Sequence, residues 1–281
     1  MTSYPSRDAG AWVENKPATG WIRLPDVREV FAHRQVAWYL ALRNVQLHYK
    51  QTLLGIVWTI LQPLLGAGLF TVIFGGLVGV PSEGKPYAVF VLAGLLGWGY
   101  FSRSLTDTSM SVLANERMVT KIYFPRLLAP LSGVLPGLLD FGVGLPILAV
   151  VMLVEGVAPS WALLTLPLWL GLLAALAFGA GCLLAATMVT YRDVAHGLPF
   201  LLQLGLFATP IIYPSSLADG DLAWAYHLNP VVGPIDGLRW ALIGTDPVSS
   251  QDLLSFACGA ILATLGVLYF CRVERRFADV I

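Results

Sequence analysis

Six long apolar runs dominate this sequence, and they limit the folds open to it more than any other feature. We place them at residues 53–78, 88–110, 128–153, 161–188, 195–213 and 251–271. A helix of about twenty apolar residues crosses the roughly 30 Å hydrocarbon core of a bilayer. Because a chain inside lipid must satisfy its own backbone hydrogen bonds, such runs form helices. The pattern predicts an all-α integral membrane protein with six transmembrane helices.

Composition agrees with a bilayer as the solvent of this chain. The sequence is 57% hydrophobic and only 12% charged, whereas about a quarter of the residues in soluble domains are charged. The formal net charge is zero, so we expect no nucleic-acid partner. The sequence has three cysteines, an odd number, and no pair has C-x-x-C spacing: Cys182, Cys258 and Cys271. This pattern predicts small buried side chains rather than a disulfide framework or a metal site.

The segment before the first run divides into two parts. Residues 1–25 contain several prolines and glycines and are predicted to be a flexible cytoplasmic tail. Residues 26–50 are predicted to form an amphipathic helix that lies in the membrane interface, with basic residues off its apolar stripe. A helix that packs on a soluble partner is the alternative. The stripe repeats at steps of three, four or seven: Val27, Phe31, Trp38, Leu42, Val45 and Tyr49.

The distribution of lysine and arginine predicts the orientation. With the N-terminus inside the cell, fourteen of the seventeen basic residues lie in cytoplasmic segments. Lys85 and Arg239 lie outside, and Arg103 falls within the second run. We therefore expect both termini of this multi-pass protein in the cytoplasm. The first fifty residues contain no apolar stretch typical of a secretory signal, so the first run is expected to act as its own insertion signal.

The segment 214–248 is predicted to be an outer re-entrant hairpin rather than an ordinary loop. Its part from Leu228 to Gly244 is largely apolar but too short to cross a bilayer. Pro230 and Pro234 could each begin a helical turn. Irregular backbone at membrane depth is tolerated only beside protein or a water-filled cavity, so we expect the outer mouth of a pathway here.

Charged residues within the apolar runs are few. Arg103 and Asp107 are four residues apart and share a helix face, and Asp140 lies in the middle of the third run. Intramembrane charges usually pair or line a pathway, and we expect an Arg103–Asp140 pair, with a direct role in transport as the alternative. The stretch from Gly79 to Pro86 resembles a phosphate-binding loop, but Pro86 replaces its Ser or Thr. We expect no ATP hydrolysis by this chain.

The order of the parts resembles the membrane subunit of an ABC-2-type exporter, over residues 26–276. The resemblance rests on five segments: "YKQTLLGIVWTILQPL", the connector "NERMVTKIYFPR", "YRDV", "YPSSL" and "LNPVVGPIDGLRWALIG". It is strongest to the branch that moves lipid-linked polysaccharides such as O-antigens, teichoic acids and mycobacterial-type galactan. It implies the type V exporter fold in a bacterial cell membrane, two copies forming the pore, and two copies of a separate ATPase subunit that binds ATP and Mg²⁺. This chain itself then needs no cofactor.

The resemblance also implies roles for particular residues. The connector would be a coupling helix that docks on the ATPase, through Asn115, Arg117, Lys121, Tyr123, Phe124 and Arg126. Alternatively, its basic residues only follow the positive-inside rule. A polyprenyl pyrophosphate headgroup would enter beside Arg43, Lys50, Leu54 and Gly55. The channel would be lined by Trp58, Phe70, Phe74, Phe200 and Phe207, although each also fits a membrane core. The outer gate would include Asn229, Pro230, Arg239 and Trp240.

Three other functions remain open from the sequence. An ABC-2 exporter of a small hydrophobic drug or lipid would need neither an aromatic channel nor a basic headgroup site. A membrane-embedded transferase would need clustered acids or histidines, whereas the outer candidates are scattered over three loops: Glu83, Glu155, Asp219, Asp221, His227, Asp236, Asp246 and Asp252. An ion-coupled transporter is disfavoured because no inverted repeat is visible and Asp140 is a lone acid.

Overall fold

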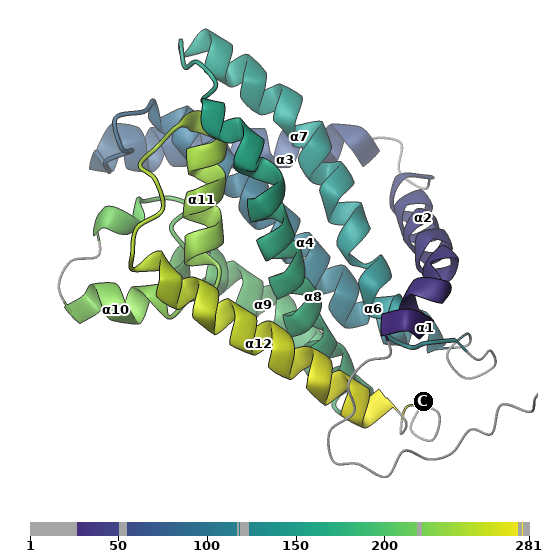
Figure 1. The fold of residues 1–281 in the computed structure, drawn as a ribbon. Helices are drawn as coiled ribbons and strands as arrows, with labels where there is room; N and C mark the ends of the chain where they lie inside the picture. The colour runs from purple at the N-terminus through teal and green to yellow at the C-terminus, as the bar shows by residue number, and fades with distance from the viewer. Residues whose placement is uncertain are drawn as a thin grey trace, which may run out of the picture.

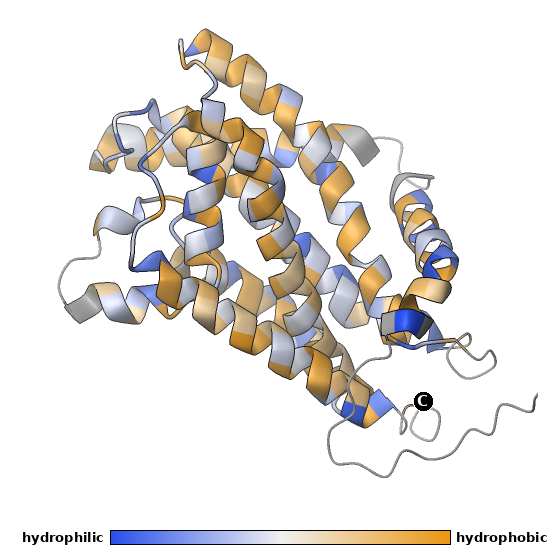
Figure 2. Cartoon of the chain, viewed as in Figure 1, coloured by the Kyte–Doolittle hydropathy of each residue, from blue (hydrophilic) through white to orange (hydrophobic). Residues whose placement is uncertain are grey.

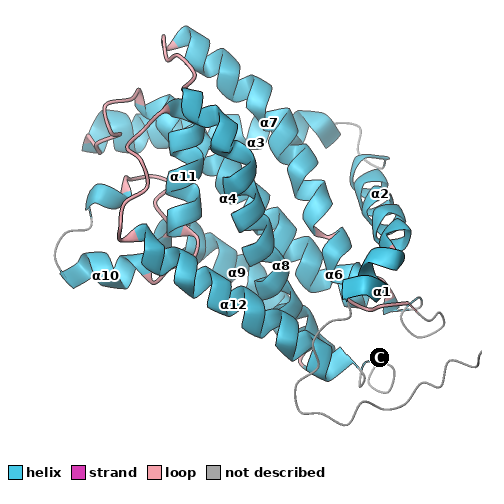
Figure 3. Cartoon of the chain, in the orientation of Figure 1, coloured by secondary structure: helices cyan, strands magenta, loops and turns pink. Residues whose placement is uncertain are grey.

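The protein is a bundle of α-helices in the computed structural model (Figure 1). The structure describes residues 27–50, 55–116, 118, 124–217, 221–274 and 277. No strand occurs among them, and Figure 3 shows only helices and loops. This confirms the predicted all-α class. The tail 1–25 and the predicted site residues Leu54, Arg117, Lys121 and Tyr123 lie outside the described residues, and only the backbone is described for Lys50 and Gly55.

Five helical segments in the described part of the chain are long and apolar enough to cross a membrane. They correspond to five of the six predicted runs. The segments are α3 (Gly55–Phe70) continued by the π-helix η1 (Thr71–Val78), α4 (Tyr87–Ala114), α6 (Leu128–Ser132) with α7 (Val134–Val154), the 3₁₀ turn η2 (Trp161–Thr165) with α8 (Leu166–Thr190), and α12 (Asp252–Val273).

The remaining run forms a shorter helix, α9 (Asp193–Ala208), of 16 residues. At 1.5 Å per residue it is about 24 Å long, less than the hydrocarbon core. The helix ends because Thr209 takes an extended conformation before Pro210, as residues before proline usually do. The sixth crossing therefore stays a prediction, although α9 lies where the sequence placed it.

The N-terminal helix is broken in two. The structure has α1 (Val27–Ala32) and α2 (Arg34–Lys50) in place of one helix, with a turn at His33. Small residues of α2 face the bundle, Ala37 and Ala41 among them. Trp38, on the predicted apolar stripe, is 53% exposed, so this aromatic side chain projects away from the bundle. That placement agrees with a helix at a membrane interface.

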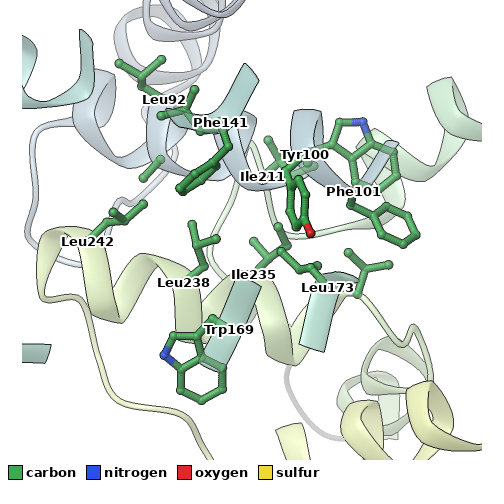
Figure 4. Close-up of a cluster of buried hydrophobic side chains, with 14 of the residues drawn as sticks. Leu92, Tyr100, Phe101, Phe141, Trp169, Leu173, Ile211, Ile235, Leu238 and Leu242 are labelled. Atoms are coloured by element: carbon green, nitrogen blue, oxygen red, sulfur yellow. The ribbon is translucent and has the colours of Figure 1, made fainter. Parts of the chain in front are cut away.

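The core is built around α4. This helix is mostly buried and packs against α3, α7, α8 and the short helix α11 (Val232–Ile243). Figure 4 shows how residues far apart in sequence meet there: Leu92, Tyr100, Phe101, Phe141, Trp169, Leu173, Ile211, Ile235, Leu238 and Leu242. The outer segment therefore contributes α11 to the core, after the shorter α10 (Asp221–His227). Short helical structure was predicted for Leu228 to Gly244, where α11 lies, and its re-entrant position relative to a bilayer stays a prediction.

Small residues allow α8 and α12 to cross closely. A Cβ atom on Gly179 would overlap the backbone of Ala263, and one on Gly266 would overlap the carbonyl of Gly179. Such contacts are typical of membrane helix pairs, in which close backbone approach replaces the hydrophobic effect. Hydrophobic residues predominate along most helices, as the colours of Figure 2 show. Many large apolar side chains are exposed on the outside of the bundle, and Leu77, Val154 and Leu164 are among the most exposed. This surface suits lipid.

Segments predicted to be cytoplasmic gather at one end of the bundle. There α1, α2 and the end of α12 lie near α6, with which the third predicted run begins (Figure 1). At the other end, Tyr87 at the start of α4 donates a hydrogen bond to the carbonyl of Ile212, at 2.6 Å. This grouping agrees with the predicted order of the segments, while the sixth crossing and the side of the membrane that each end faces stay predictions.

Candidate functional site

A cavity of about 760 Å³ opens among α3, α4, α7 and α9, at middle depth in the bundle. Its size suits a ligand of several rings. Its walls combine aromatic faces with hydroxyl, amide and charged groups, which is unusual between membrane-length helices. The polar lining comprises Thr59, Gln62, Ser102, Arg103, Thr106, Asp107, Asp140 and Gln203. The aromatic lining comprises Trp58, Trp98, Tyr100 and Phe141.

One face of α4 supplies half of the residues of the polar wall. This face carries Ser102, Arg103, Thr106 and Asp107. Successive members are one or three residues apart in the sequence, so they lie on adjacent turns of the helix. The Nε of Arg103 donates to an Oδ of Asp107 at 2.7 Å. Their side chains are 27% and 22% exposed, so this pair is open to the cavity. The prediction that the two share a face is correct.

Asp140 reaches the same cavity from α7. The structure therefore brings Arg103 and Asp140, the predicted intramembrane pair, to one site. The ion pair described for Arg103 is with Asp107, and a direct Arg103–Asp140 contact stays a prediction. The three charges come together because α4 and α7 pack side by side.

A glycine sets the position of α9 against this site. A Cβ atom on Gly205 would lie 2.7 Å from the ring of Trp98, closer than real Cβ atoms approach other atoms. Trp98 itself is buried and packs against Phe101, with ring centroids 5.6 Å apart. Gly205 therefore lets α9 approach α4 closely enough to form the wall that carries Gln203.

The predicted channel aromatics separate into three groups. Trp58 lines the cavity and is half exposed. Phe70 and Phe74 pack edge to face on each other, with centroids 5.9 Å apart, nearer the outer end of the same segment. Phe200 and Phe207 lie on an exposed face of α9, at 62% and 51% exposure. Of the five, only Trp58 lies on the cavity, and the lining of a channel by any of them stays a prediction.

The predicted entrance and coupling residues are linked at the other end of the bundle. Arg43 of α2 donates to the Oδ1 of Asn115, directly after α4, at 2.5 Å. Asn115 is buried, and its amide nitrogen donates to the carbonyl of Ser111 at 2.7 Å. At the far side of the connector, Phe124 is buried and Arg126 donates to the carbonyl of Glu274. Both ends of the connector are thus anchored to the bundle, a long-range arrangement that the sequence did not indicate.

Arg239, predicted at the outer gate, lies inside the protein. It is 1% exposed, and its guanidinium carbon lies 3.8 Å from the ring centroid of Phe90. It donates to the carbonyl of Ile211 at 2.8 Å and lies 3.6 Å from an Oδ of Asp236. Burial lowers the pKa of Arg239, and burial raises the pKa of the Asp236 carboxyl to about 7 although Arg239 opposes that rise. These contacts give Arg239 a role in holding α11 against α4.

The other three predicted gate residues join neighbouring segments. Asn229 donates to the carbonyl of Ala208 and to the hydroxyl of Thr209, each at 3.1 Å, so it connects the end of α9 to the start of α11. Pro230 is partly buried beside α12. Trp240 packs edge to face on Trp161, with centroids 5.7 Å apart. A gating function for these residues stays a prediction.

The outer acidic residues are less scattered than the sequence suggested. Four of them meet His227 at a second cavity, of about 440 Å³, lined by Glu83, His227, Asp236, Asp246 and Asp252. His227 lies 3.4 Å from Asp252, and burial raises the pKa of Glu83. The expectation failed because the tertiary fold brings Glu83, of the first outer loop, beside the acids and the histidine of residues 227–252. Among the described residues, no group of three or more acids, histidines or cysteines could hold a metal ion.

Comparisons with known proteins cover most of the chain. A family model described as ABC-2 type transporter matches residues 35–243. The O-antigen export system permease protein RfbA of Klebsiella pneumoniae is 28% identical over 245 residues, which are 85% of this chain and 92% of the relative. A second Klebsiella protein of that name is 27% identical over 248 residues. RfbA of Myxococcus xanthus is 31% identical over 208 residues, which are 73% of this chain and 79% of the relative.

Proposed function

Since the chain belongs to the ABC-2 type transporter family, we propose that it is the membrane-spanning permease subunit of an ATP-driven polysaccharide exporter. Its substrate would be a glycan linked to polyprenyl pyrophosphate. The names of the relatives, O-antigen export permeases, support the polysaccharide. Two copies of this chain would form the pore in a bacterial cell membrane, with both termini in the cytoplasm. Two copies of a partner ATPase would bind ATP and Mg²⁺.

The observation that carries this proposal is the mid-bundle cavity. Polar and charged groups between membrane helices are costly unless they pair or line a pathway. Here hydroxyls, amides and charges face a space of about 760 Å³ beside the exposed ring of Trp58. Such a wall suits a polymer of hydroxyl-rich rings. The lining also contains leucine and proline side chains, so the polar groups favour a glycan while a small hydrophobic drug or lipid remains the alternative.

The proposed mechanism begins at the cytoplasmic rim, where the headgroup would meet Arg43 and Lys50. ATP binding closes the partner subunits and pushes on the connector between α4 and α6. Asn115, at the start of this connector, accepts a hydrogen bond from Arg43, and this contact supports a joint movement of α2 and α4. The dimer interface then opens, the headgroup crosses, and the glycan follows through repeated ATP cycles.

The first test is purification of this chain from native membranes, followed by mass spectrometry of its protein partners and bound lipids. We expect an ABC ATPase subunit and a polyprenyl-linked glycan in the same sample. Recovery without an ATPase would contradict the subunit division. Recovery with the ATPase and a small hydrophobic compound, but no glycan, would favour the drug or lipid exporter.

The second test addresses coupling. Asn115→Ala removes the acceptor of the Arg43 hydrogen bond, so in the purified complex we expect ATP hydrolysis to persist while export falls. Glu155→Gln, in an exposed loop at the opposite end, is the matched control and should leave both rates unchanged. Equal loss of hydrolysis and export in Asn115→Ala would show that the contact only holds the fold together.

A further inference from the structure

We infer that the mid-bundle cavity selects the exported polymer by charge. It fits a glycan whose repeating units are neutral or carry an amino group, and it disfavours units that carry carboxylate or phosphate. This inference rests on the proposed function, because it names the substrate class of the same cavity. It concerns the repeating units of the polymer and not the lipid that carries them.

The cavity has an excess of negative charge. Three charged side chains line it among the residues that the structure describes: Arg103, Asp107 and Asp140. One is positive and two are negative, so their formal net charge is −1, however the three pair with one another. The one cation donates to a carboxylate at 2.7 Å, so it already has a negative partner before any ligand arrives.

An anionic sugar would meet repulsion at this place. Proteins that bind phosphate or carboxylate usually present arginine clusters or paired donors, and the described lining holds one arginine. This repulsion acts over the short distances that the cavity sets, and it is strongest at low ionic strength, where salt screens it least. Each acidic unit of a polymer would face the same repulsion as it passed.

A neutral sugar would find suitable partners. The lining offers hydroxyls and amides that both donate and accept hydrogen bonds: Thr59, Gln62, Ser102, Thr106 and Gln203. Trp58 supplies an exposed aromatic face for the apolar side of a sugar ring. An amino sugar would gain attraction to the two carboxylates as well.

The pyrophosphate headgroup does not contradict this selection. A polymer carries one headgroup and many repeating units, so the charge of the units decides how often an anion must pass the cavity. A phosphate-backbone polymer of the teichoic acid type is therefore disfavoured as the cargo. Polymers of the O-antigen or galactan type remain, provided that their units are not acidic.

The first experiment identifies the natural cargo. The gene is deleted in its own host, and the lipid-linked polymer that accumulates in the cytoplasm is isolated and analysed for uronic acid, phosphate and amino sugars. A neutral or amino-substituted repeating unit is expected. An acidic repeating unit would overturn the charge selection while leaving the proposed function intact. Absence of any accumulated glycan would overturn the proposed function itself.

The second experiment varies the charge of the cavity. The full-length chain is placed in lipid nanodiscs, and tryptophan fluorescence reports binding of a neutral glucan oligosaccharide or a polyglucuronate oligosaccharide of equal length. The wild type should bind the neutral probe about tenfold more tightly at low ionic strength, with a smaller ratio at high salt. Asp107→Asn and Asp140→Asn each bring the formal charge to zero and should nearly abolish the preference.

The double variant Asp107→Asn/Asp140→Asn is the decisive test, because it gives the lining of the cavity a positive formal charge. It should bind the acidic probe more tightly than the neutral one, whereas Glu155→Gln, outside the cavity, should behave as the wild type. Unchanged preference in the double variant would overturn the inference, as would equal binding of both probes by the wild type. Failure of both probes to bind would overturn the assignment of this cavity to a glycan, and the inference with it.

Discussion

Arg239 and Arg103 both lie on helices of the bundle, but Arg239 is buried and Arg103 is partly exposed. Arg239 is 1% exposed, lies over the ring of Phe90 and donates to a backbone carbonyl. Arg103 is 27% exposed and pairs with Asp107 on the wall of a cavity. The first is enclosed by the fold and the second is open to a space that a ligand can occupy. An arginine that is buried with its acidic partner is therefore structural, whereas one whose ion pair is open to a cavity is a candidate for function. The presence of the two residues in the sequence does not make this distinction.

The largest expected effect comes from Arg239→Met. The substitution leaves the Ile211 carbonyl without its donor and Asp236 without its counter-charge, and breaking a buried pair costs about 3–5 kcal/mol. We expect a large fall in the unfolding free energy of the purified protein, measured by denaturant titration in detergent. Part of the loss should be recovered as the pH falls, because Arg239 no longer opposes the rise in the pKa of Asp236 and the carboxyl takes up a proton at a higher pH than in the wild type. A loss below about 1 kcal/mol would contradict the structural role.

A second effect is a pH dependence that Asp236 gives to the wild type. Its pKa is raised from 3.8 to about 7 in the folded protein, chiefly by burial, so between these values the folded state binds more protons than the unfolded state. Stability should therefore fall as pH rises from about 4 to about 7 and level off above. Asp236→Asn should flatten this part of the thermal unfolding profile. An unchanged slope in that variant would assign the dependence to other groups.

A third effect concerns the contact between Gly205 of α9 and Trp98 of α4, on the wall of the cavity. Gly205→Ala places a Cβ atom 2.7 Å from the ring of Trp98, so α9 or the ring must shift. Overpacking of this kind costs about 1–3 kcal/mol. Gly171→Ala is the control, because a Cβ atom there meets no other atom within 4 Å. We expect the Gly205 variant, but not the control, to lose unfolding free energy and to change the fluorescence of the cavity tryptophans.

The sequence predicts well the features that depend only on the residues of one segment. Hydropathy placed five membrane-length helices and the position of α9, because a helix in lipid must satisfy its backbone within its own residues. Four-residue spacing placed Arg103 and Asp107 on one face. These features need no knowledge of neighbouring segments.

Features that depend on distant segments were missed or misplaced. The sequence did not indicate that α11 carries Arg239 into the core beside Phe90, and its place at an outer gate stays a prediction. The partner of Arg43 is Asn115, 72 residues away, and no local pattern indicates that contact. The outer acids were expected to be scattered, and the fold gathers five titratable side chains at one cavity. Periodicity reports which face of a helix is apolar, but not which helix will cover that face.

The smallest effect on stability, and the sharpest test of the comparison, is expected from Arg103→Met. The substitution matches Arg239→Met in chemistry, but the remaining carboxylates face a cavity in which they can be solvated. Exposed pairs contribute about 0–1 kcal/mol, so denaturant titration should give an unfolding free energy close to that of the wild type. Export by the intact complex should nevertheless fall, because the wall of the cavity has changed. If Arg103→Met destabilises the protein as much as Arg239→Met does, the cavity does not solvate its charges and Arg103 belongs with the structural arginine.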